Sequence, residues 1–148
     1  MNNFHQSPQA YVGHVTLNVM DLNRSIPFYT EMLGFNILNQ TATSVDFTAD
    51  GSTSLLTINQ PAHVTQRPQR TTGMYHFALL LPKRSDLADF LALFITSCFP
   101  YCASDHLVSE ALYIADPDGN EIEIYTDRQA DEWTWLEDGV QMTIDPIN

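Results

Sequence analysis

The order of apolar and polar positions predicts a strand followed by a helix near the start of the chain. In residues 12–19, small or apolar residues alternate with polar ones and β-branched types are common, which is typical of a strand with one buried face. Residues 21–25 have the composition of a helix start, and apolar residues then recur at helical spacing from Ile26 to Leu33. Gly34 indicates that the helix ends there.

Three short strands are predicted after this helix, at residues 35–40, 44–49 and 53–59. Asp50-Gly51 separates the last two as a hairpin turn. Residues 11–60 are therefore predicted to form a βαβββ module. Residues 61–72 are polar, contain two prolines and show no periodicity, so they are predicted to be a connector.

The pattern then starts again in residues 73–127. A strand is predicted at 73–81, a helix from Ser85, and strands around 106–115 and 121–126. Both halves have, in the same order, a histidine in the opening strand, Arg-Ser at the helix start and an Asp-Gly turn before the last strand. This order is what duplication of one supersecondary unit predicts.

The predicted fold class is α+β, with both modules in a single domain over residues 1–148. A length of 148 residues is typical of one domain, although two small modules can share a core at that size. Residues 128–148 form a tail that fits neither module. The tail holds Trp133 and Trp135 among many carboxylates, which suggests a segment packed on the modules or a linker.

Composition narrows the classes of partner. Six Lys and Arg against eighteen Asp and Glu give a formal charge of -12, which repels phosphate backbones and anionic lipid surfaces. We therefore expect no nucleic acid and no membrane partner. The sequence has no apolar run near the roughly 20 residues that span a bilayer, and its start lacks the features of a signal peptide, so a cytoplasmic location is expected.

Cys98 and Cys102 are the two cysteines of the chain. Two thiols without signs of secretion do not favour a disulfide framework, and two soft ligands alone do not complete a structural zinc site. We expect both to be buried thiols.

Two histidines occupy matching places in the two opening strands. A histidine among apolar neighbours is more often a hydrogen-bonded core residue than a metal ligand. If the halves are duplicated, however, pseudo-symmetric packing would bring His14 and His76 together. Two buried cations would be costly there, whereas two neutral imidazoles and a metal ion would not. This hypothesis requires a carboxylate to complete the site.

The last predicted strand supplies two candidate carboxylates. Because side chains alternate along a strand, Glu121 and Glu123 point to the same face and Ile122 and Ile124 to the other. This face is either solvated or directed into a cavity. Glu123 lies deeper in the strand and is the preferred ligand, with Glu121 as the fallback.

Three motifs together resemble the vicinal oxygen chelate superfamily. They are GHVTLNVMDLNRSIPFYTEMLGF, GMYHFALLLP and YIADPDGNEIEIY, and the resemblance covers residues 11–127. The superfamily includes glyoxalases, bleomycin-resistance proteins, fosfomycin-resistance thiol transferases and extradiol ring-cleavage dioxygenases. The stretch DHLVSEALYIADPDGNEIEIY looks most like the N-terminal domain of two-domain catechol-2,3-dioxygenase-like proteins of bacteria.

The resemblance implies a fold and a ligand set. The two modules would form an incomplete barrel around a divalent metal ion, with ligands at His14, His76 and Glu123. Aligning the halves on their Asp-Gly turns matches Glu123 with Leu55, so the first half offers no fourth ligand. Two histidines and one carboxylate form the arrangement of non-haem Fe(II) oxygenases. The expected metal is Fe(II), with Mn(II), Zn(II) and Ni(II) as alternatives.

Two further residues resemble pocket residues of ring-cleaving relatives. His106 resembles a histidine that moves protons between substrate, oxygen and product. Tyr113 resembles a tyrosine that hydrogen-bonds the substrate oxygen. The alternatives are a surface histidine and a tyrosine of the core.

These features give three competing hypotheses. The first is an Fe(II)-dependent extradiol dioxygenase whose partners are a small catecholic aromatic substrate and dioxygen. The second is a glyoxalase or thiol transferase that uses another metal at the same ligands. The third is a metal-free small-molecule-binding resistance protein. A homodimer is expected because association of two chains would bury an open barrel edge and the tail tryptophans.

Overall fold

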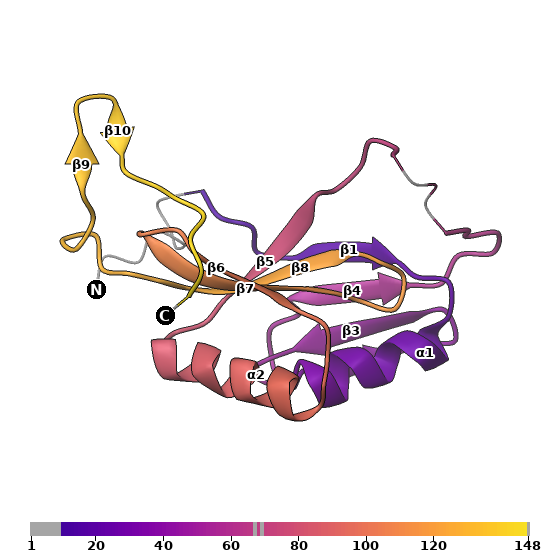
Figure 1. Cartoon of the computed structure of the whole chain (residues 1–148). Helices are drawn as coiled ribbons and strands as arrows, with labels where there is room; N and C mark the ends of the chain where they lie inside the picture. The colour runs from indigo at the N-terminus through magenta and orange to yellow at the C-terminus, as the bar shows by residue number, and fades with distance from the viewer. Residues whose placement is uncertain (1–9, 67, 69, 148) are drawn as a thin grey trace. The chain divides into compact units, whose positions relative to one another are not determined.

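The computed structural model describes residues 10–66, 68 and 70–147 (Figure 1). Residues 1–9, on which part of the signal-peptide argument rests, lie outside this range. The described residues divide into two compact units. The N-terminal unit extends to Gly73 and includes the turn Asp116–Gly119, and the C-terminal unit comprises Met74–Ala115 and the residues from Asn120 onward. That both modules form one domain stays a prediction.

The N-terminal unit contains the βαβββ module that the sequence predicts. Its elements are β1 (Val15–Asn18), α1 (Leu22–Pro27), the π-helical segment η1 (Phe28–Met32), β2 (Asn36–Gln40), β3 (Ser44–Thr48) and β4 (Leu56–Asn59). The strands form one sheet in the order β1-β4-β3-β2. β1 and β4 are parallel, and the other neighbours are antiparallel.

The helical run of this unit begins and ends where the sequence predicts. The side chain of Asp21 accepts a hydrogen bond from a backbone N–H of the first turn and so caps the helix. Pro27 lies inside the run and has no N–H. After it, the N–H of Leu33 donates to the carbonyl of Phe28 five residues earlier, as in a π-helix. Gly34, with a φ of +75°, ends the run.

The C-terminal unit repeats the module and adds a hairpin. Its elements are β5 (His76–Leu80), α2 (Arg84–Thr96), β6 (Cys102–Asp105), β7 (Ser109–Ala115), β8 (Glu121–Asp127), β9 (Trp135–Leu136) and β10 (Gly139–Val140). The sheet order is β5-β8-β7-β6, with β5 and β8 parallel. The α+β class with two βαβββ modules is thus confirmed. Among the described residues, no helix is long and apolar enough to cross a membrane.

β6 is a strand that the sequence pattern did not predict. Its residues, CASD, are small or polar and have little intrinsic strand preference. The strand forms because it pairs antiparallel with β7 at the edge of the sheet. The strand predicted around 106–115 begins only at Ser109, so His106 lies in the connection between β6 and β7.

The prediction of two buried thiols was wrong, because Cys98 and Cys102 are both exposed and free. That prediction rested on the usual burial of free cysteines and not on the position of these two in the fold. α2 ends at Thr96, and Cys98 has a φ of +53° in the loop that follows. Cys102 begins the edge strand β6.

Alternate strand positions build the apolar core of each unit. In the N-terminal unit, the ring of Tyr29 packs on Phe47 at 5.2 Å between ring centroids, and both residues are fully buried. Other buried residues of this core are Val19, Val45, Leu56 and Ile58. The C-terminal core includes Phe94, Leu112, Ile122 and Ile124. Removing this apolar surface from water is the main stabilising contribution to each unit.

The turn Asp116–Gly119 belongs to the N-terminal unit through its polar contacts. The buried hydroxyl of Tyr29 donates to Asp116 at 2.8 Å. Burial, together with the nearby charge of Asp116, raises the pKa of Tyr29 far above its usual value, so the phenol keeps its proton. Asp118 accepts hydrogen bonds from the backbone N–H of Met20 and from Arg24. The Asp-Pro-Asp-Gly turn of the second module is thereby anchored to the helix of the first.

Candidate active site

The alternation along β8 directs Glu123 away from the core. Ile122 and Ile124 are fully buried, whereas the side chain of Glu123 is 14% exposed on the opposite face. This confirms the predicted alternation. In the sheet, Glu123 pairs with Ala78 of β5 on one side and with Tyr113 of β7 on the other. The residues beside Glu123 are therefore set by the strand register.

A continuous chain of polar contacts runs through Glu123. One carboxylate oxygen, Oε2, lies 2.9 Å from Nε2 of His76. The other, Oε1, accepts a hydrogen bond from the hydroxyl of Tyr113 at 2.8 Å. The same hydroxyl lies 2.9 Å from Nε2 of His106, and Nδ1 of His106 lies 2.8 Å from the carbonyl of Thr143. The structure thus brings together four of the five predicted site residues within the C-terminal unit.

The hydrogen-bonding partners determine which atoms in this chain of polar contacts carry hydrogen. The Thr143 carbonyl can only accept, so Nδ1 of His106 donates to it. Three hydrogens are needed for the contacts among Thr143, His106, Tyr113 and Glu123, but a neutral imidazole and a phenol supply only two. Nε2 of His106 can therefore face the Tyr113 hydroxyl either as a donor or as an acceptor, depending on whether the ring carries a second hydrogen. This arrangement is suited to storing and moving a proton.

The phenol of Tyr113 is held in its neutral form. Burial raises the pKa of Tyr113 well above its usual value, and the hydrogen bond to Glu123 and the charge of that carboxylate raise it further. Tyr113 therefore acts as a hydrogen-bonding bridge between Glu123 and His106, and not as a tyrosinate, at neutral pH.

The imidazole of His76 has one ring nitrogen without a partner. Nδ1 of His76 is buried and makes no hydrogen bond, while Nε2 is engaged with Glu123. The side chain is 26% exposed. Nε2 is thus the ring nitrogen of His76 with a polar contact among the described residues, and that contact is to the carboxylate of Glu123.

A pocket of about 650 Å³ opens beside this chain of contacts. His76, His106 and Tyr113 line it, and all lining residues belong to the C-terminal unit. Its walls are mostly apolar and include Tyr75, Tyr101, Ile114 and Ile144. Pockets of this size, with few polar groups among apolar walls, are typical of small-molecule sites.

Glu121, the fallback ligand, lies elsewhere on the same face. It is exposed, lines the pocket and pairs in register with His76 at the start of β8. The ion-pair contact of His76 is made by Glu123. This geometry favours Glu123 over Glu121 as a shared partner of the histidine.

His14, the fifth predicted residue, belongs to the N-terminal unit and directly precedes β1. Its Nε2 lies 2.9 Å from the hydroxyl of Thr57, which donates to Asp46 at 2.6 Å. Among the described residues, no three His, Cys, Asp or Glu side chains are gathered so as to hold an ion. The complete ligand set stays a prediction.

The two sheets match in register when His14 is aligned with His76. Thr16 pairs with Thr57 as Ala78 pairs with Glu123, so the counterpart of Glu123 is Thr57 and not Leu55. The alignment on the Asp-Gly turns was therefore wrong by two residues, because the segments after these turns differ in length. The matching position of the first module still offers no carboxylate.

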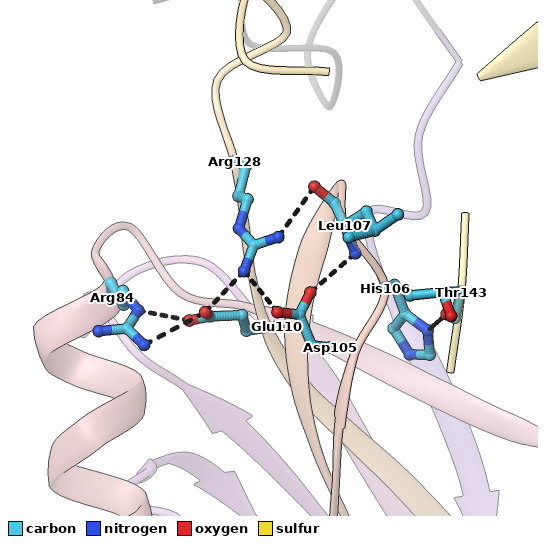
Figure 2. A network of polar contacts seen from close by, with 7 residues as sticks. All are labelled: Arg84, Asp105, His106, Leu107, Glu110, Arg128 and Thr143. Carbon is cyan, nitrogen blue, oxygen red and sulfur yellow. Dashed lines mark hydrogen bonds and ion pairs between the residues drawn. The ribbon is translucent and has the colours of Figure 1, made fainter. Parts of the chain in front are cut away.

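A second polar network supports the connection that carries His106 (Figure 2). Glu110 is buried and accepts hydrogen bonds from Arg84 and from Arg128, the latter at 2.9 Å. Arg128 also donates to Asp105 at 2.7 Å and to the carbonyl of Leu107 at 3.0 Å. Burial alone would raise the pKa of Glu110, but the hydrogen bonds and charges of both arginines outweigh it and lower that pKa below 4.5.

Sequence reasoning missed this network and the contact of Thr143. Glu110 lies in the strand sequence SEALYIA, where most neighbours are apolar. A glutamate in such a strand indicates a buried carboxylate that requires a charged or hydrogen-bonding partner. The contact of Thr143 is made by a backbone carbonyl, for which the residue type carries no signal.

Comparisons with known proteins agree with this architecture. Residues 11–124 match the family model described as Glyoxalase/Bleomycin resistance protein/Dioxygenase superfamily. Among solved structures, a glyoxalase/dioxygenase from Nostoc punctiforme shares 22% identity with a TM-score of 0.66, covering 80% of this chain and 91% of that one. A glyoxylase/bleomycin resistance protein/dioxygenase domain from Frankia sp. EAN1pec has a TM-score of 0.64 at 22% identity, covering 80% and 98%. At this identity the two structures show the shared fold.

Curated relatives extend the comparison. The chain is 40% identical over 134 residues to the catechol-2,3-dioxygenase of Bacillus subtilis (strain 168), covering 90% of this chain and 46% of that protein. It is 28% identical over 141 residues to the biphenyl-2,3-diol 1,2-dioxygenase 3 of Rhodococcus globerulus, covering 92% and 74%. The chain thus spans about half the length of the first of these relatives. It belongs to the glyoxalase/bleomycin resistance/dioxygenase superfamily, as its motifs indicated.

The Glu110 network predicts a pH-dependent contribution to stability. Glu110→Gln should lower the free energy of unfolding at pH 7 by about 1–3 kcal/mol, because Arg84 and Arg128 both lose the ion pair with Glu110, although Arg128 keeps its ion pair with Asp105. Since the pKa of Glu110 is depressed in the folded state, the difference from wild type should be complete above pH 4.5 and shrink as the pH falls through the folded value. Urea unfolding at pH 7 and pH 3 measures this. Glu137→Gln, at an exposed position, is the control, and an equal difference at both pH values would contradict the assignment.

Proposed function

We propose that this protein is a metal-dependent extradiol ring-cleavage dioxygenase that acts on a small catecholic aromatic. The observation that carries the proposal is the contact chain from His76 through Glu123 and Tyr113 to His106, beside a mostly apolar pocket. The similarity to two proteins named as dioxygenases of aromatic diols supports the same reaction class. Dioxygen is the second substrate in this proposal.

The donor atoms of His76 and Glu123 fit a common metal ion. Two ligands with bonds near 2.1 Å at right angles to each other are about 3 Å apart, and Nε2 and Oε2 are 2.9 Å apart. With His14 as the third ligand, the set is two histidines and one carboxylate, which suits Fe(II) and leaves positions open. When bound, Fe(II) would acidify the hydroxyls of a chelating catechol and activate dioxygen.

The protein side chains then have distinct tasks. His106 and Tyr113 hold and move a proton at the edge of the pocket, where the substrate hydroxyls lose protons and the product regains one. The apolar walls, among them Tyr75 and Ile114, provide a surface on which an aromatic ring can pack.

Metal binding should depend on all three proposed ligands. His14→Ala, His76→Ala and Glu123→Ala are each expected to abolish stoichiometric Fe(II) binding, because a three-ligand site cannot spare one. Titration calorimetry under anaerobic conditions measures the affinity, and His63→Asn, in the exposed connector, is the control. If the wild-type protein binds no divalent ion, the metal-free resistance-protein hypothesis replaces this proposal.

Turnover should depend on His106 without loss of the metal. His106→Phe is expected to bind Fe(II) as the wild type does while its rate of catechol-dependent oxygen consumption falls by about 10² to 10⁴, because general acid–base assistance is lost. An oxygen electrode and metal analysis of the same sample test both parts. If the iron-loaded wild type binds catechols without consuming oxygen, the dioxygenase assignment fails while the metal site stands.

We also propose a homodimer in the cytoplasm. Trp135 is 65% exposed on the β9–β10 hairpin, and its ring lies 6.1 Å from that of Trp133. Burial of this exposed apolar surface would favour association. Light scattering at micromolar concentration should give twice the mass of one chain, and Trp135→Ser should shift the mass toward the monomer. A wild-type monomer would contradict the dimer.

A further inference from the structure

Residues Thr143–Asp145 lie against the connection that carries His106. The N–H of Asp105 donates to the carbonyl of Asp145 at 2.7 Å, and the N–H of Asp145 donates back to the carbonyl of Asp105 at 3.0 Å. This pair is an isolated antiparallel bridge. Two residues before it, the carbonyl of Thr143 accepts from Nδ1 of His106, as Figure 2 shows. We refer to residues 143–145 as the bridging segment.

The bridging segment determines the orientation of the His106 ring. The ring plane is defined by two contacts on opposite nitrogens, one to Thr143 and one to Tyr113. The Thr143 carbonyl requires a hydrogen on Nδ1 and thereby directs Nε2 toward the hydroxyl of Tyr113. Without this acceptor, the ring would keep only the contact to Tyr113 and could rotate about its side-chain bonds.

The backbone on the other side of His106 is already constrained. Leu107 has a φ of +68°, which a leucine rarely adopts. Its N–H donates to Asp105 at 2.8 Å, and its carbonyl accepts from Arg128. Arg128 therefore binds the side chain of Asp105, and the bridging segment binds the backbone of the same residue.

We propose that the bridging segment is a positioning element of the active site, which holds His106 with Nε2 toward Tyr113 and the pocket. Its middle residue, Ile144, lines that pocket, so the segment also supplies part of the wall. The catalytic consequence rests on the proposed dioxygenase function, whereas the orientation of the ring does not. The proposal is argued from the contacts of Thr143 and Asp145 and uses no metal ligand.

Asp145→Pro and Asp145→Ala form a matched pair that tests the proposal. Proline removes the N–H that donates to Asp105, while alanine keeps it and removes only an exposed side chain. A second variant that ends at Met142 removes the whole segment. Unchanged circular dichroism in each variant shows that the sheet remains folded.

The first measurement is the histidine-ring ¹H–¹⁵N NMR spectrum. The wild type and Asp145→Ala should show a slowly exchanging Nδ1–H signal of His106, identified by its absence in His106→Phe. Asp145→Pro and the variant ending at Met142 should lose this signal. The second measurement is steady-state oxygen consumption with a catechol, where Asp145→Pro should lower kcat by about ten- to a hundredfold with KM within twofold.

The outcomes separate this proposal from the proposed function. If both disrupting variants keep the ring signal, the positioning role is overturned, whether or not kcat changes. If the ring signal is lost but kcat of an active enzyme is unchanged, the catalytic consequence is overturned. If the wild type consumes no oxygen, the proposed function fails and the NMR comparison still decides the positioning role.

Discussion

The position of β8 between β5 and β7 is the constraint on which the candidate site depends. Because side chains alternate along a strand, a β8 whose isoleucines enter the core must turn Glu123 to the other face. The register then places Glu123 opposite Tyr113 and within reach of His76. A shift of one residue would bury the glutamates and expose Ile122 and Ile124. Because losing these isoleucines from the core is unfavourable, the same burial that stabilises the sheet also fixes the register that positions the site.

Charge compensation organises the edge of the same sheet. Glu110 is buried, and a buried carboxylate is stable only when it is paired and hydrogen-bonded. Arg84 and Arg128 satisfy it, and Arg128 extends the network to Asp105 and the carbonyl of Leu107. The residues that neutralise this buried charge thus also hold the connection of the chain that carries His106.

The two modules use one geometry with different chemistry. In both, the first histidine contacts a side chain of the last strand, which in turn contacts a residue of the neighbouring antiparallel strand. The three residues are His14, Thr57 and Asp46 in the first module, and His76, Glu123 and Tyr113 in the second. The backbone geometry of the repeat is therefore the same in the two halves, while the residue at the matching position is a hydroxyl, Thr57, in the first and a carboxylate, Glu123, in the second.

The sequence by itself determined the element order of the first module, the return of the strand and helix pattern in the second, the helix start at residues 21–25 and the opposite faces of Glu123 and its isoleucine neighbours, because helical period, strand period and turn residues are local properties. Family motifs also selected His76, His106 and Tyr113, which the structure brings together with Glu123.

Only the tertiary structure decided the rest. β6 forms through pairing with β7 despite weak local preference, and the exposure of Cys98 follows from where α2 ends. The match of Thr57 to Glu123 depends on the register of paired strands, which turn alignment does not reveal when loop lengths differ. The contact of His106 with Thr143 joins residues 37 positions apart through a backbone carbonyl. Every residue carries this group, so the residue type at position 143 could not predict the contact.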